Sequence, residues 1–73
     1  MATFITIKND FITLGQFLKL TKIINNGGEA RYFLLNTNVL VNENLEKRRG
    51  KKLRSEDTIK INEQEFVVKT IKE

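Results

Sequence analysis

The chain contains neither cysteine nor histidine, and this absence restricts what its 73 residues can fold into. Disulfide bonds and zinc sites built from thiolates or imidazoles are excluded. A chain of this length is near the lower limit for a single hydrophobic core, so its apolar residues must form that core without cross-links. We therefore expect residues 1–73 to form one domain with no cofactor, no metal site and little room for a buried catalytic cleft.

The sequence also lacks the signals of a membrane or exported protein. Its first ten residues contain no basic segment followed by an apolar stretch, and no apolar run approaches the roughly 20 residues of a membrane-spanning helix. We therefore expect a cytoplasmic protein that makes no membrane contact.

Positive charge is concentrated in residues 47–54, KRRGKKLR, which we call the basic run. The run holds six of the 13 lysine and arginine residues and no acid, which leaves seven cations and nine acids in the rest of the chain. Because neighbouring cations repel one another, the asymmetry indicates a local site for a polyanion rather than only a solvated loop. Arginine forks and lysine ammonium groups both bind phosphate, and no base-reading pattern is visible. The pattern favours recognition of phosphates and helix shape.

The first half of the chain predicts one strand and two helices. Residues 3–7 are β-branched or aromatic, as in a strand. Thr13 stands where a helix N-cap would, and apolar residues then recur with helical spacing through residues 14–24. The Asn-Asn-Gly-Gly segment at 25–28 ends this helix, and a second helix is expected from Glu29. The tight connection predicts a compact two-helix hairpin.

The second half predicts short strands. Residues 39–41 are apolar with high β propensity, residues 58–61 alternate polar and apolar, and residues 66–71 close a hairpin at the end of the chain. The basic run lies between the first two of these strands, so we expect both of its ends to be anchored in the sheet. The resulting fold class is α+β, with the helices packed on one side of a small, mainly antiparallel sheet.

Residues on the outward faces of the two helices could extend the polyanion site. The first turn of the second helix offers backbone N–H groups for a phosphate, with Arg31 beside them. Gln16, Lys19 and Lys22 lie on the outward face of the first helix. Tyr32 could stack on an unpaired base, or simply cover the edge of the core.

Several motifs resemble, at the same spacings, those of the S4 RNA-binding domain family. They are LGQFL at 14–18, GEAR at 28–31 with FL at 33–34, VLVN at 39–42 and DTI at 57–59. The segment NLEKRRGKKLR at 44–54 resembles, more narrowly, small stand-alone bacterial S4-domain proteins of the YaaA type. The resemblance covers about residues 3–62.

The resemblance implies an S4-like (αL motif) fold in which the two helices and the following loop form one RNA-facing surface. We expect a monomer that binds structured RNA, with ribosomal RNA as the expected target and ribosomal proteins as further partners. The RNA contacts that the resemblance implies are Thr13, Gln16, Lys19, Asn26, Arg31, Lys47, Arg48, Arg49, Lys51, Lys52 and Arg54.

The chain departs from the family pattern at four positions. Gly27 replaces the arginine of a Ser-Arg pair found in many members, and Thr37, Glu43 and Glu56 replace glycines common in the family's turns. The contacts by which other S4 proteins read sequence are therefore not transferred to this chain.

Other classes of function stay open at this point. The basic run could bind an acidic protein partner, or DNA in place of RNA. An enzyme would have to use carboxylates such as Asp10, Glu29, Asp57 or Glu63. None of them has sequence neighbours that indicate a catalytic or metal site, so the leading hypothesis is a non-enzymatic binder of structured RNA.

Overall fold

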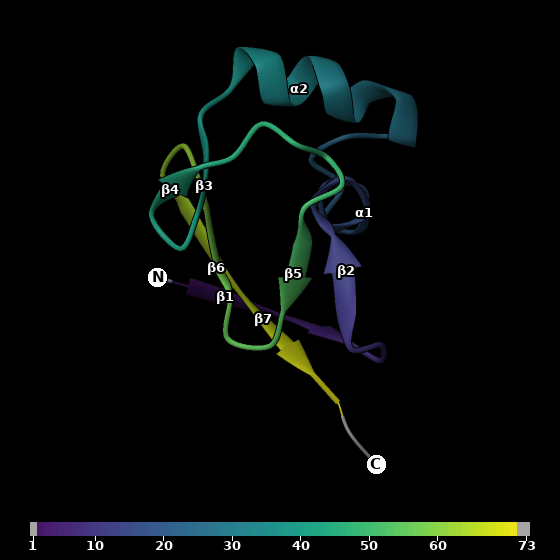
Figure 1. Cartoon of the computed structure of the whole chain (residues 1–73), viewed down its shortest axis with the longest axis vertical. Coiled ribbons are helices and arrows are strands. Elements are labelled where there is room, and N and C mark those ends of the chain that lie inside the picture. Colours follow the sequence, from purple (N-terminus) through teal and green to yellow (C-terminus); the bar gives the residue numbers. More distant parts are fainter. Residues whose placement is uncertain (1, 72–73) are drawn as a thin grey trace.

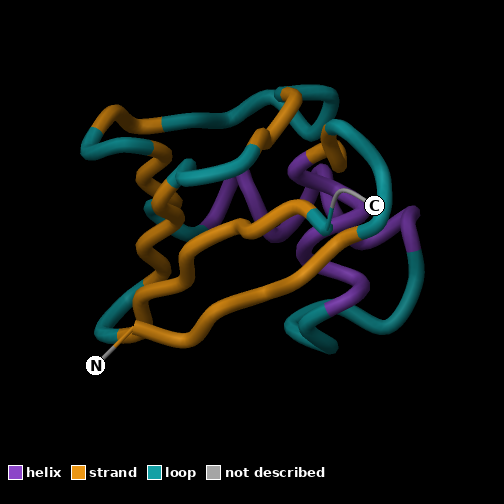
Figure 2. The backbone as a smooth tube through the Cα atoms, turned by 90° about the horizontal axis from the view of Figure 1, so that it is seen from below, coloured by secondary structure: helices purple, strands orange, loops and turns teal. Residues whose placement is uncertain are grey.

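The first and last strands of the chain lie side by side in the fold and run in the same direction. The computed structural model describes residues 2–71. In it, strand β1 (Ala2–Ile7) pairs in parallel with strand β7 (Gln64–Thr70) along its whole length. Figure 2 shows these as two long neighbouring strands, one beginning near the N label and the other ending near the C label. The parallel pairing was not expected, because each strand's partner is far away in the sequence.

Strands β1 and β7 belong to a five-stranded mixed sheet with the order β1-β7-β6-β3-β4. Strand β6 (Thr58–Ile61) pairs antiparallel with both β7 and β3 (Val39–Val41), and β3 pairs with β4 (Asn44–Leu45) at the edge. The predicted strands at 39–41 and 58–61 and the hairpin between β6 and β7 are confirmed.

A second, two-stranded sheet joins the basic run to the segment before the first helix. Strand β2 (Phe11–Thr13) pairs antiparallel with β5 (Lys52–Arg54), which is the last part of the run. The prediction of a continuous loop over the run is therefore wrong at these residues. The side chain of Leu53 is completely buried in the core, which fixes the strand. Three-residue strands are too short to give a periodic signal.

Helix α1 (Leu14–Leu20) begins at the predicted N-cap, Thr13, but ends four residues earlier than its apolar spacing indicates. The Thr21 hydroxyl donates to the carbonyl of Phe17 at 2.9 Å, and Lys22 then adopts a left-handed φ of 62°. A left-handed residue ends an α-helix. Ile24 is still buried in the core, at 3% exposure. The apolar spacing therefore predicted the buried positions correctly but overestimated the length of the helix.

Helix α2 (Ala30–Asn36) follows a short 3-10 turn, η1 (Gly27–Glu29). Figure 1 looks along α1 and shows α2 from the side, so the two helices cross steeply. They contact each other, but their connection runs from residue 21 to residue 29 and is longer than the tight turn predicted. No helix in residues 2–71 is long and apolar enough to cross a membrane.

One hydrophobic core joins the helices to the main sheet. The rings of Phe17 on α1 and Phe66 on β7 meet edge to face with centroids 5.3 Å apart. Around them are the other buried apolar residues, Ile7, Leu14, Leu18, Ile24, Ala30, Leu34, Val39, Val41, Leu53, Ile59, Ile61 and Val68. The α+β class predicted from the sequence is confirmed.

Candidate nucleic-acid interface

The middle of the basic run is docked on the start of α1. The backbone N–H of Leu14 donates to the carbonyl of Lys51 at 2.8 Å, and that of Gly15 donates to the carbonyl of Arg49 at 2.9 Å. The first N–H groups of a helix have no partner within the helix itself. The run supplies two of those partners, so its backbone is held against the start of α1 (Figure 1). The side chains of Arg49, Lys52 and Arg54 are exposed, and that of Lys51 is half-buried.

Gly15 lies where α1, α2 and the basic run meet. A Cβ atom at this position would lie 3.5 Å from both the Cβ and the carbonyl oxygen of Arg49, and 3.7 Å from the Cβ of Ala30. These are ordinary contact distances with no room for a longer side chain. The small residue therefore allows the run to pack against both helices.

Two cations of the run have partners within the protein. The Lys47 ammonium donates to the carbonyl of Leu34 at 2.7 Å and to that of Thr37 at 3.4 Å, at the negative end of α2. Arg48 Nε donates to Glu46 Oε2 at 3.0 Å, and its hydrogen bonds hold the pKa of the Glu46 carboxyl below its usual value. Lys47 therefore has a structural role in addition to its predicted RNA contact.

The other four cations of the run are available to a ligand. Within residues 2–71 none of them forms an ion pair with a carboxylate. Arg49, Lys51, Lys52 and Arg54 are thus the cations of the run without an ion pair among the described residues, whereas Arg48 is paired with Glu46.

Phe11 adds an aromatic ring to the site. Cross-strand pairing places it opposite Arg54, and the ring centroid is 4.9 Å from Lys52 Nζ and 5.4 Å from Arg54 Cζ. Both distances are within the range of a cation–π contact. Phe11 was not among the predicted contacts, because its position depends on the unforeseen pairing of β2 with β5.

The predicted contacts Thr13 and Gln16 also form the capping box of α1. Thr13 Oγ1 accepts from the N–H of Gln16 at 3.3 Å, and Gln16 Oε1 accepts from the N–H of Thr13 at 3.0 Å. Thr13 also pairs with Lys52 across the two-stranded sheet. Gln16 and Lys19 line a groove next to this sheet.

At the start of α2, where a phosphate contact was predicted, Glu29 bonds to the residues that precede the helix. The carboxylate of Glu29 accepts from the backbone N–H of Asn25 and from Asn26 Nδ2, both at 3.2 Å. The carboxylate therefore holds the segment before α2, with Asn26 as one of its partners, and makes no side-chain cap hydrogen bond to the helix. Arg31 lies on the outer side of α2, next to the exposed Tyr32 and Leu35.

The predicted contacts thus fall into groups. Thr13, Gln16, Lys19, Lys52 and Arg54 come together around β2 and α1, whereas Arg48, Arg49 and Lys51 lie where the run crosses the start of α1. Asn26 and Arg31 lie at the start of α2, and Lys47 lies at its end.

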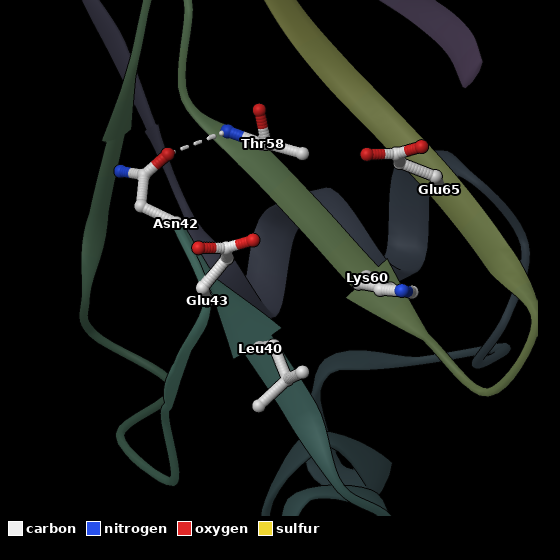
Figure 3. Close-up of a pocket in the computed structure, with 6 residues that line it drawn as sticks. All are labelled: Leu40, Asn42, Glu43, Thr58, Lys60 and Glu65. Carbon is white, nitrogen blue, oxygen red and sulfur yellow. Dashed lines mark hydrogen bonds between the residues drawn. The ribbon is translucent and has the colours of Figure 1, made fainter.

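The outer face of the main sheet has a different character. Figure 3 shows a recess there in which the side chains of Glu43 and Glu65 lie on either side of the β6 strand that carries Lys60. Asn42 Oδ1 accepts from the N–H of Thr58 at 2.9 Å and holds the rim of this recess. Carboxylates beside its one lysine make this face unfavourable for a polyanion.

Two of the departures from the family's turn glycines keep the backbone conformation that glycine favours. Glu43 has a φ of 70° and Glu56 a φ of 76°, both left-handed, and the Glu56 carboxylate forms an ion pair with Lys69. Thr37 is extended, with a φ of −134°, and needs no glycine. The turns are therefore retained without their glycines.

The mixed sheet, the two crossing helices and the docked cationic segment are the parts of an S4 domain, and the chain belongs to the S4 domain family. The family model, described as S4 domain, matches residues 5–69. Among curated proteins, the chain is similar to the probable ribosome maturation protein RlbA of Bacillus subtilis (strain 168), with 49% identity over 61 residues that span 84% of this chain and 86% of the relative. The resemblance stated from the sequence motifs is confirmed.

Proposed function

We propose that this protein is a non-enzymatic, monomeric RNA-binding protein of the cytoplasm that recognises structured RNA through phosphate and shape contacts. Ribosomal RNA is the proposed target, because the name of the relative RlbA refers to ribosome maturation. The observation that carries the proposal is the docking of the basic run on α1 by the hydrogen bonds of Leu14 and Gly15.

Docking favours binding, because less conformational entropy is lost on binding when the backbone that carries the charged groups is already ordered. The carbonyls of Arg49 and Lys51 are held by α1, and Lys52 and Arg54 lie on a strand beside Phe11. A fixed row of cations suits the regular spacing of phosphates in an RNA helix, whereas a free tail would have to be ordered on binding.

The acids considered as catalytic candidates support a non-enzymatic role where their partners are seen. Asp57 Oδ2 accepts from the N–H of Arg54 at 2.7 Å, and its Oδ1 accepts from Asn42 Nδ2 at 3.0 Å. Glu29 accepts from residues 25 and 26 in the same way. Both carboxylates hold turns of the backbone in place.

The salt dependence of binding to a fluorescent RNA hairpin tests the proposal. If the four cations without ion pairs each neutralise one phosphate, log K should fall with log salt with a slope of about −3 to −3.6. A slope near zero contradicts the proposal. A DNA duplex of the same sequence should compete less well, because only RNA presents the 2′-hydroxyl and the A-form groove.

A pull-down from cell lysate separates RNA from a protein partner. Ribosomal proteins recovered with the wild-type chain should disappear after nuclease treatment if RNA bridges them. Their retention at full yield after nuclease treatment would instead indicate that the basic run binds an acidic protein.

A further inference from the structure

A shallow groove of about 640 Å³ lies beside the basic run, between the turn that joins β1 to β2 and the outward side of α1. Its lining combines apolar side chains with lysines, and none of its lining residues is acidic. The apolar lining comes from Ile7, Phe11, Ile12 and Leu20, and the lysines are Lys8, Lys19 and Lys22. We call it the lysine groove.

Leu20 is one of the exposed large apolar residues of the described chain. Its side chain is 52% exposed at the last position of α1, where it lines the groove and is not part of the buried core. An exposed leucine next to three lysines suits a ligand that combines an apolar flat part with negative charge. A nucleotide has both properties.

Lys22 has a backbone conformation that glycine would adopt at lower cost. Its N–H donates to the carbonyl of Lys19 and that of Ile23 to the carbonyl of Leu18, each at 3.0 Å, which is the glycine-type ending of an α-helix. Its φ of 62° is disfavoured for a residue with a Cβ. The lysine is thus kept at a glycine-type position, where it lines the groove.

The lysine groove is continuous with the basic run. Phe11 lines the groove, and the same ring lies under Lys52 and Arg54 of the run. A strand of RNA whose phosphates contact β5 would therefore have its next nucleotide at the groove. The carboxylates of an acidic peptide would pair with the lysines as well as phosphates do. Such a peptide would, however, leave the apolar side chains that line the groove without a contact.

We propose that the lysine groove binds one unpaired nucleotide of a bound RNA, with its base against Leu20 and Phe11 and its phosphate at Lys19 and Lys22. This proposal rests on the proposed function, since it requires that the basic run contacts RNA. It adds a preference that phosphate contacts alone do not give: folded RNA with an unpaired nucleotide should bind more tightly than a continuous helix.

Two RNA hairpins with the same stem test this preference, one fully paired and one with a single unpaired adenosine. Wild-type protein should bind the bulged hairpin about tenfold more tightly, from stacking of one base. Lys22→Gly and Leu20→Gln should each remove most of this preference and change affinity for the paired hairpin by less than about twofold. Lys22→Gly relieves the left-handed lysine, so a lost preference cannot be ascribed to a damaged fold.

Leu35→Gln is the matched control, because Leu35 is an exposed leucine on α2, at 62%, and does not line the groove. It should keep the full preference. Equal binding of the two hairpins by the wild type overturns the groove proposal and leaves the proposed function standing. Failure to bind either hairpin overturns the proposed function itself.

Adenosine monophosphate and inorganic phosphate, titrated separately into isotope-labelled protein, provide a second test. Adenosine monophosphate should shift the backbone amide signals of Phe11, Leu20 and Lys22, and inorganic phosphate should shift them much less. Equal shifts with the two probes would reduce the groove to a simple anion site and contradict the proposal.

Discussion

At the scale of single residues, the carboxylate of Glu46 pairs with the guanidinium of Arg48, which is one of the proposed RNA contacts. The two are 3.0 Å apart, and the Arg48 side chain is 76% exposed, so a phosphate could reach it. Glu46→Gln should tighten binding to an RNA hairpin by about two- to fivefold and steepen the salt slope by up to about 0.9. Fluorescence anisotropy over a salt series measures both. Glu63→Gln, the same charge change in the β6–β7 turn, should have no comparable effect, and equal gains in the two variants would contradict the prediction.

The same pair makes stability depend on pH. The hydrogen bond from Arg48 lowers the pKa of Glu46 in the folded state. Its contribution is therefore fully present above the unfolded pKa of a glutamate, about 4.3, and is lost as pH falls through the lower folded value. We expect the difference in Tm between wild type and Glu46→Gln to be constant from about pH 7 to about pH 5 and to shrink below about pH 4. A difference that grows on acidification would contradict this assignment.

At the scale of elements, the contact of the basic run with α1 depends on the size of residue 15. Gly15→Ala should be tolerated, because its Cβ would make ordinary contacts at 3.5 Å and alanine favours a helix by about 1 kcal/mol over glycine. Gly15→Leu should push Arg49 away from α1 and weaken RNA binding about tenfold or more, through loss of the ordered run. Urea unfolding checks the first variant and anisotropy the second. Wild-type affinity in folded Gly15→Leu would show that docking is not needed.

At the scale of the whole molecule, charge is divided between two faces. Arg49 belongs to the docked run, whereas Lys60 lies on the outer face of the sheet near Glu43 and Glu65 (Figure 3). Arg49→Gln and Lys60→Gln each lower the formal net charge of +4 by one. If position decides binding, only Arg49→Gln should reduce the salt slope, by about 0.7 to 0.9, with a uniform loss of affinity across RNA sequences. Equal losses in the two variants would show that net charge alone governs binding.

The sequence by itself determined the features that depend on near neighbours. Thr13 and Gln16 are three residues apart and form the capping box of α1, and the alternation at 58–61 correctly gave strand β6. The apolar spacing through residue 24 identified core positions, because burial and periodicity are linked whether or not the helix continues. The motifs also identified the S4 family, since they depend on residue types at fixed spacings.

Only the tertiary structure decided which distant segments meet. The parallel pairing of β1 with β7 and the pairing of Phe11 with Arg54 join residues that are far apart in the sequence. The local sequence around one partner gives no information about which distant residue it pairs with. The same holds for the docking of the run on Gly15 and for the contact of Lys47 with the end of α2, which only the folded chain brings together. Local residue preferences determined most helices and strands, and composition determined the net charge. Long-range packing decided on which face of the molecule the charged side chains lie.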